Sequence, residues 1–72
     1  MALQELRQTM DMSQEDLSKK LETKQANISR LEHRTDMYIS TLSSYIKALG
    51  GELDIIARFP GGDVHINQFS ER

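Results

Sequence analysis

One short stretch, residues 24–32, carries most of the side chains in this sequence that could recognise another molecule. Lys, Arg, Gln and Asn can all hydrogen-bond the edges of base pairs in a DNA major groove. The stretch has such side chains at Lys24, Gln25, Asn27 and Arg30. Ile28 and Leu31, three residues apart, add a narrow apolar edge. We therefore expect a short helix with one polar face and one apolar edge.

No set of residues elsewhere in the sequence has the pattern of a catalytic or metal-binding site. Ser43 and Ser44 have no nearby base of the kind a nucleophilic serine needs, and no paired carboxylates stand in an acid–base context. Without cysteine, His33 and His65 cannot fill a structural zinc site. We predict that both histidines are ordinary surface residues and that the protein is not an enzyme and uses no metal or cofactor.

The charge of the chain is unevenly distributed, although its net value is only −2. Residues 1–18 carry −3, residues 19–34 carry +3, and residues 35–72 carry −2. The basic segment coincides with the proposed helix at 24–32, so an acidic body would meet phosphates with one face only. Alternatively, Lys19, Lys20 and Lys24 simply solvate a helix surface.

The length of 72 residues allows one domain with a small core. Since no cysteine is available for a disulfide, a second subunit is the expected source of extra stability. The sequence shows no signal peptide and no apolar run of about 20 residues, and the absence of cysteine fits a reducing compartment. We expect a soluble cytoplasmic protein that does not enter membranes.

Apolar residues at spacings of three and four predict four helices in the first fifty residues. We expect them at residues 2–10, 14–21, 24–33 and 37–49. The first starts almost at the initiator methionine, which suggests that a natural segment is missing before it. The second and third helices, joined by the tight turn Glu22–Thr23, indicate a helix-turn-helix, a motif that presents its second helix to DNA.

Several polar residues are candidates to cap these helices. Ser13 is a good N-cap for the second helix, although Asp16 replaces the usual Glu or Gln and makes the capping box imperfect. Thr23 is a candidate cap for the third helix, and Thr35 or Asp36 for the fourth. Gly50 and Gly51 should end the fourth helix.

After Gly51 the apolar spacing changes to two, which predicts strands. Residues 52–59 should pair with residues 64–69 in a β-hairpin around a turn at 60–63. Such a hairpin is marginal alone, so it must pack on the helices, pair with a second copy, or both. We predict intermolecular strand pairing, with the dimer interface at Leu53, Ile55, Ile56, Ala57 and Phe59.

Residues 12–32, MSQEDLSKKLETKQANISRLE, resemble the helix-turn-helix of the Cro/CI-type, XRE-like family. The continuation through residue 62 is similar to small XRE regulators of bacterial toxin–antitoxin modules, in particular HigA-type antitoxins. The resemblance implies a mainly α fold, with a four-helix lambda-repressor-like domain at 1–50. The β-hairpin at 51–72 would follow as a dimerisation element of the same domain.

The resemblance also implies roles for individual residues. Lys24, Gln25, Ala26, Asn27 and Arg30 would contact bases, and Arg7 with Glu32 would form a buried ion pair. Gln14 would contact phosphate and hydrogen-bond the first residue of the helix at 24–32, here called the reading helix. The other expected backbone contacts are Ser13, Lys20, Ser29, Arg34 and Tyr38. For Arg34 and Tyr38 an ordinary surface position is about equally consistent with the sequence.

In two turns the sequence departs from the family pattern. The family often has glycine where this chain has Asp11 and Glu22. Glu22 is the more costly replacement, because a positive φ strains a non-glycine residue and Asp tolerates it better. We therefore expect a turn before the reading helix that differs locally from the family's usual form.

Two functions follow as hypotheses. In the first, a homodimeric repressor binds a near-palindromic operator and regulates its own operon as the antitoxin of a type II toxin–antitoxin module. Its partner would be a RelE/HigB-like toxin in a bacterial cytoplasm. In the second, the chain is a protein-interaction module whose main task is to neutralise that toxin, through the apolar face of the hairpin and the acidic C-terminal region.

Overall fold

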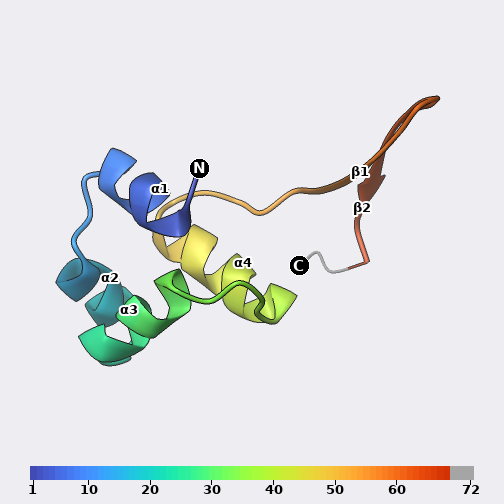
Figure 1. The fold of residues 1–72 in the computed structure, drawn as a ribbon. Coiled ribbons are helices and arrows are strands. Elements are labelled where there is room, and N and C mark those ends of the chain that lie inside the picture. The colour runs from blue at the N-terminus through green and yellow to red at the C-terminus, as the bar shows by residue number, and fades with distance from the viewer. Residues whose placement is uncertain (69–72) are drawn as a thin grey trace.

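The computed structural model describes residues 1–68 as four helices followed by a two-stranded hairpin (Figure 1). The helices are α1 (Leu3–Thr9), α2 (Gln14–Lys20), α3 (Gln25–Glu32) and α4 (Ile39–Ala48). The antiparallel strands are β1 (Ile55–Phe59) and β2 (Gly62–Ile66). This confirms the mainly α fold with a C-terminal hairpin. In residues 1–68 the longest helix has ten residues, and no helix could cross a lipid bilayer.

Helices α1, α2 and α4 end in the same hydrogen-bonding pattern, the Schellman motif. After α2, the N–H of Thr23 donates to the carbonyl of Ser18 at 2.9 Å, and that of Glu22 donates to Lys19 at 3.3 Å. Equivalent pairs of bonds close α1 and α4. The motif requires a residue in the left-handed conformation, and only α4 supplies glycine there, at Gly50 with a φ of 94°.

The other two positions of this kind are Asp11, with a φ of 57°, and Glu22, with a φ of 54°. Both adopt the conformation for which glycine is favoured. The expected local difference in the turn before α3 is therefore wrong, because Glu22 takes the positive φ itself and the Schellman bonds form. The strain that the sequence predicted at Glu22 is present in the backbone.

The core is small and lies between the four helices. Leu17, Ile28, Tyr45 and Leu49 are its buried apolar members. Seven partly buried apolar residues from α1, α3, α4 and the turns after α1 and α2 pack against them: Leu3, Leu6, Met12, Leu21, Leu31, Ile46 and Ala48. Ser18, buried in α2, is small enough to allow α3 to cross closely.

The hairpin has an apolar face and a mixed face. Ile55 pairs with Ile66, Ala57 with Val64, and Phe59 with Gly62. Directly opposed residues point to the same side of a sheet, so these pairs make one continuous apolar face. The other side carries Ile56 with His65, and Arg58 with Asp63, whose Nε and Oδ1 atoms lie 3.5 Å apart.

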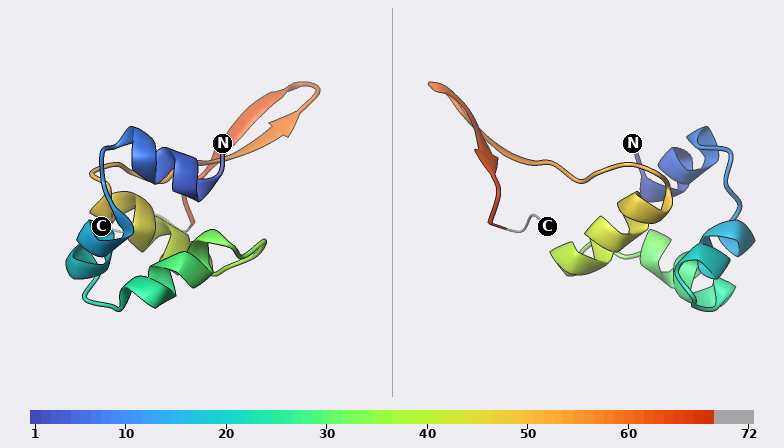
Figure 2. Two further views of the ribbon diagram at one scale, coloured as in Figure 1. Left: turned by 60° about the vertical axis from the view of Figure 1, so that its left-hand side comes forward. Right: turned by 180° about the vertical axis from the view of Figure 1, so that it is seen from behind.

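The hairpin stands away from the helices in every view (Figures 1 and 2). No residue of β1 or β2 belongs to the core or packs against it in the part of the chain that the structure describes. Phe59 and Val64 remain more than half exposed. The hairpin therefore leaves its apolar face uncovered.

Several element boundaries differ from those predicted. Helix α4 begins at Ile39, not at residue 37, and its N-cap is Tyr38, not Thr35 or Asp36. Strand β1 begins at Ile55 because β2 ends at Ile66, opposite it, which leaves residues 52–54 without paired neighbours. Strand β2 begins at Gly62 because the loop contains only residues 60–61. Phe69, expected at the end of that strand, lies outside the described residues.

Candidate nucleic-acid interface

Helix α3 carries the side chains expected to read DNA bases. Lys24, Gln25, Ala26 and Arg30 are exposed, and Asn27 is half-buried. On the opposite edge Ile28 is fully buried in the core and Leu31 packs against it. The polar face and apolar edge predicted from the spacing are thus both present, and the apolar edge fixes which side of α3 faces outward.

At its C-terminal end, α3 is hydrogen-bonded to the other three helices through one carboxylate, that of Glu32. The Nε of Arg7, in α1, donates to Oε2 of Glu32 at 2.7 Å, and its Nη2 donates to Oε1 at 3.3 Å. Gln14, in α2, donates to Oε1 at 2.9 Å, and the Tyr45 hydroxyl, in α4, donates to Oε2 at 2.6 Å. Each carboxylate oxygen therefore accepts two hydrogen bonds, and one group in α3 contacts all three other helices.

The Arg7–Glu32 ion pair is confirmed and is buried. The Glu32 side chain has no exposed surface, and that of Arg7 is 7% exposed. Burial alone would raise the pKa of Glu32, but hydrogen bonds from Arg7, Tyr45 and Gln14 outweigh it and hold the pKa below its ordinary value. Burial and the same carboxylate raise the pKa of the Tyr45 hydroxyl, so Tyr45 stays protonated as a donor.

The same group of side chains also holds the turn after α1. The Nη1 of Arg7 donates to the carbonyl oxygen of Met12 at 2.9 Å. No buried side-chain nitrogen or oxygen in residues 1–68 lacks a hydrogen-bond partner. A satisfied buried network has few alternative geometries, so it fixes the angle at which α3 leaves the body.

Gln14 makes a different hydrogen bond from the predicted one. Its amide donates to Glu32, the last residue of α3, and not to the first residue of that helix. The reason is that α2 and α3 cross, which brings the start of α2 beside the end of α3. A phosphate contact by the remaining polar atoms of this half-buried side chain stays a prediction.

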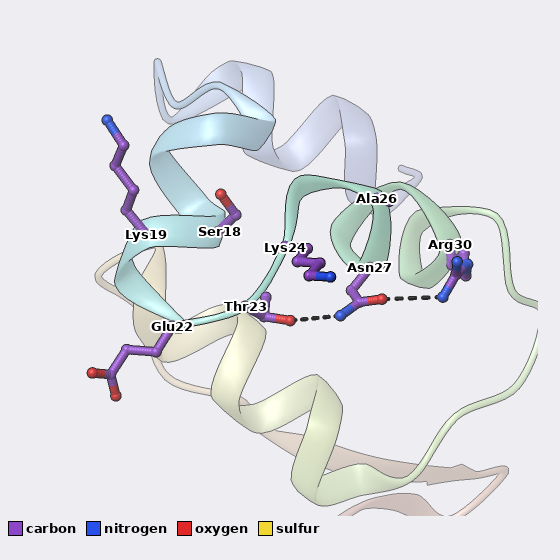
Figure 3. Close-up of a pocket in the computed structure, with 8 residues that line it drawn as sticks. All are labelled: Ser18, Lys19, Glu22, Thr23, Lys24, Ala26, Asn27 and Arg30. Atoms are coloured by element: carbon purple, nitrogen blue, oxygen red, sulfur yellow. Dashed lines mark hydrogen bonds between the residues drawn. The ribbon is translucent and has the colours of Figure 1, made fainter.

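The other end of α3 carries a row of three hydrogen-bonded side chains (Figure 3). Asn27 donates from Nδ2 to the Thr23 hydroxyl at 2.8 Å, and Arg30 donates from Nη1 to Oδ1 of Asn27 at 3.1 Å. The N-cap of α3 is Lys24, which makes no side-chain capping bond. Thr23 is therefore not the cap that the sequence suggested, because its hydroxyl is used by Asn27.

This row lines an open recess where α2 and α3 meet. Three cations, Lys19, Lys24 and Arg30, border it together with one anion, Glu22. Figure 3 shows Lys24, Asn27 and Arg30 on the same side of α3. The recess therefore has a positive balance, which suits a phosphate-rich partner.

The residues expected to contact the DNA backbone lie mainly at helix ends. Ser13 is the N-cap of α2, Lys20 is its last residue, and Tyr38 is the N-cap of α4. All three are exposed, as is Arg34 after α3, and Tyr38 reaches 82%. Ser29 is half-buried, and its carbonyl lies 2.7 Å from Nδ1 of His33. Their contacts with DNA stay predictions.

The Ser13 cap forms a complete capping box, contrary to the expectation of an imperfect one. Its Oγ accepts from the Asp16 N–H at 3.0 Å, and its own N–H donates to Asp16 Oδ2 at 3.3 Å. Hydrogen bonds to the carboxyl from the Ser13 side chain and the Ser13 backbone N–H lower the pKa of Asp16. The shorter Asp side chain therefore suffices for the box, with a longer second bond.

The five predicted dimer residues do not share one face. Ile55, Ala57 and Phe59 lie on the apolar face of the hairpin, whereas Ile56 lies on the opposite side beside Arg58. Leu53 precedes β1 in extended chain. Ile55, Ala57 and Phe59 could therefore share one flat interface with Val64 and Ile66 of β2, and the dimer contacts of all five predicted residues stay a prediction.

Sequence reasoning missed two residues that position the site. Tyr45 was not among the predicted site residues, yet it is fully buried and donates to Glu32. Its place three residues after Leu42 and four before Leu49 was the available signal. Thr23 was considered only as a cap, although its spacing of four from Asn27 is the spacing of side chains that meet on a helix surface.

Comparison with known proteins gives a consistent picture. The model of a family described as "Helix-turn-helix domain" matches residues 1–58. A solved structure described as "DNA bound antitoxin HigA3" is 29% identical, with a TM-score of 0.85 over 100% of this chain and 96% of the other. Another, "Induced DNA bending by unique dimerization of HigA antitoxin", is 32% identical, with a TM-score of 0.81 over 90% of each chain. A search of curated protein sequences gave no match.

Proposed function

This chain belongs to the helix-turn-helix domain family, and on that premise we propose its function. We propose that the protein is a sequence-specific DNA-binding repressor and the antitoxin of a type II toxin–antitoxin module whose operon it regulates. The observation that carries the proposal is the setting of α3. Gln25, Ala26 and Arg30 are exposed on a helix whose last residue, Glu32, is hydrogen-bonded to all three other helices. The similarity to two HigA antitoxin structures supports it.

In this function α3 enters the major groove and each exposed side chain has a fitting target. Arg30 has further N–H groups beyond the one bound to Asn27, enough for a bidentate contact with guanine. The Gln25 amide suits adenine, and the Ala26 methyl suits the methyl group of thymine. Lys24 and Asn27 contact neighbouring bases or phosphates.

The phosphate backbone on either side is held by six residues that lie at helix ends, just after α3 or within it. They fix the register of the protein on the duplex without reading its sequence. They are Ser13, Gln14, Lys20, Ser29, Arg34 and Tyr38.

The protein acts as a homodimer through its hairpin. Ile55, Ala57 and Phe59 present an apolar face that none of the helices covers. Two copies that place these faces together remove apolar surface from water and bring two α3 helices to one side of a duplex. The half-sites then lie about 10 bp, or roughly 34 Å, apart on a near-palindrome.

The toxin partner is a RelE/HigB-like protein, and both act in the bacterial cytoplasm, where the operator lies. The protein itself has no enzymatic activity in this proposal, because its work is binding. The observations in support are the antitoxin class of the similar structures and an α3 face made of side chains suited to base contacts.

The test replaces the two central base-reading residues. Gln25→Ala combined with Arg30→Ala should abolish binding to the DNA upstream of the protein's own coding sequence, measured by fluorescence anisotropy. Circular dichroism and sedimentation should match the parent, because both side chains are exposed. Gln4→Ala with Gln8→Ala, on exposed positions of α1, is the matched control and should bind normally. Retained specific binding by the double variant contradicts the proposal.

One observation favours a second candidate, a module that mainly neutralises a partner protein. The apolar face of the hairpin, with Phe59 58% and Val64 54% exposed, is an exposed apolar patch of the kind that binds other proteins. The salt dependence of the affinity for duplex DNA distinguishes the two functions. A repressor that contacts several phosphates loses affinity for duplex DNA steeply as salt rises, whereas a neutralising module shows a flat response or no binding.

A further inference from the structure

We propose that Thr23 is a positioning residue for base recognition, acting on Arg30 through Asn27. The proposal rests on the proposed DNA-binding function and deepens it. Thr23 itself is not among the residues that touch DNA in that function. It sets the geometry of the arginine that reads guanine, and so contributes to specificity from the turn before α3.

The three side chains lie in one row along α3, with the spacing that a helix surface requires. Thr23 precedes Asn27 by four residues and Asn27 precedes Arg30 by three, so all three face the same side. The two hydrogen bonds that join them measure 2.8 and 3.1 Å. Figure 3 shows the row running from Thr23 in the turn along the helix to Arg30.

The donors and acceptors along the row have only one consistent direction. Arginine can only donate, so the atom of Asn27 that faces Arg30 must be the carbonyl oxygen. The Asn27 nitrogen then faces Thr23, whose hydroxyl oxygen accepts. Arg30 therefore selects the carbonyl oxygen of the Asn27 amide. The Thr23 hydroxyl accepts from the amide nitrogen and holds the Asn27 side chain in the position from which its oxygen meets Arg30.

Thr23 is itself held in place by backbone bonds. Its N–H donates to the carbonyl of Ser18 at 2.9 Å in the Schellman motif that ends α2. Its side chain is half-buried between α2 and α3. The row is therefore anchored to the fixed end of α2, and Arg30 is held relative to both helices of the motif.

This anchoring matters because a free arginine has many conformations. An exposed arginine loses side-chain entropy when it is fixed against a base, and that loss weakens binding. In the free protein the hydrogen bond to Asn27 already restricts the conformations of Arg30, so less side-chain entropy is lost when DNA binds. Phosphate attraction depends on charge alone and gains little from such order. The row therefore raises discrimination for guanine more than it raises general affinity.

The test measures discrimination in Thr23→Val, which keeps the branched shape and removes the hydroxyl. The probe is the duplex that the parent binds, together with the same duplex in which the guanine read by Arg30 is replaced. We expect the affinity ratio between the two to fall about three- to tenfold, the range for one lost hydrogen bond. Thr23→Ser keeps the hydroxyl and should restore the ratio.

A second arm shows whether Thr23 acts through Arg30. In an Arg30→Ala background Thr23→Val should no longer change the ratio or the affinity. An equal effect of Thr23→Val with and without Arg30 overturns the proposal, since Thr23 then contacts DNA directly or supports the fold. So does an unchanged ratio in the first arm.

A third arm needs no DNA and separates this proposal from the proposed function. In the free protein, NMR relaxation at the Arg30 Nε–H should show more motion in Thr23→Val than in the parent or in Thr23→Ser. Equal motion in all three overturns the positioning role, whether or not the parent binds DNA. If the parent protein binds no duplex, the proposed function is overturned. The NMR measurement then still tests whether Thr23 orders Arg30 through Asn27.

Discussion

In the helical body, residues 3–49, one carboxylate in α3 is hydrogen-bonded to three other helices, whereas the hairpin, residues 55–66, leaves a whole apolar face in water. The body contains the partners that its buried groups need. The hairpin does not, and a two-stranded hairpin alone is marginally stable. The contrast teaches that the body is complete within one chain, while the hairpin is built for a surface outside it.

The largest effect should come from breaking the buried ion pair. Arg7→Ala leaves the Glu32 carboxylate buried without its cation and should lower the free energy of unfolding by roughly 3–5 kcal/mol. Urea denaturation followed by circular dichroism measures it. The matched control is Glu15→Ala, which removes an exposed ion pair with Lys19 and should change stability by less than about 1 kcal/mol. An Arg7→Ala protein as stable as the parent would show that the body does not depend on this ion pair.

The second effect concerns the hairpin and should leave the body intact. Phe59→Ser removes a large apolar side chain from the proposed dimer face and should weaken dimerisation about 10- to 100-fold, measured by sedimentation. Ile56→Ser, on the other face of the same strand, is the control, and its dimerisation affinity should lie much closer to that of the parent than the affinity of Phe59→Ser does. Equal effects of the two substitutions would remove the distinction between the faces.

Acid should lower the free energy of unfolding more gradually and by less than Arg7→Ala does, because protonation neutralises the Glu32 carboxylate but leaves its side chain in place. Its pKa in the folded state lies below the ordinary value of 4.5, so the folded protein binds this proton more weakly than the unfolded chain does. The stabilisation is therefore present above pH 4.5 and is lost as the pH falls through the lower folded pKa. The stability difference between the parent and Glu32→Gln should shrink over that range. A difference that stays constant to pH 3 would contradict this.

The smallest effect should be a gain in the body. Glu22→Gly relieves the positive φ of 54° and should raise the free energy of unfolding by up to about 1 kcal/mol, since added freedom of the unfolded chain offsets part of the relief. Asp11→Gly should gain less, because Asp tolerates this conformation better. Thermal unfolding of the two variants measures both. A loss of stability in Glu22→Gly would mean that the turn is not strained.

The sequence predicted the local features well where the signal lies within a few residues. The spacing of Ile28 and Leu31 predicted the buried edge of α3, and Ser13 predicted the start of α2. Alternation after Gly51 predicted both the hairpin and its apolar face. Strand ends were less accurate, because the end of one strand depends on where its partner stops. The Arg7–Glu32 pair was predicted only through resemblance to a family.

By itself, then, the sequence determined the helices, the hairpin and the polar face of α3, because short-range spacing and capping specify them. Only the tertiary structure decided that Tyr45 and Gln14 meet Glu32 together with Arg7. Tyr45 and Gln14 lie 13 and 18 residues from it, and Arg7 lies 25 residues away. No local pattern chooses partners at those distances. The crossing of the helices does, and a buried carboxylate accepts the donors that the crossing brings within reach.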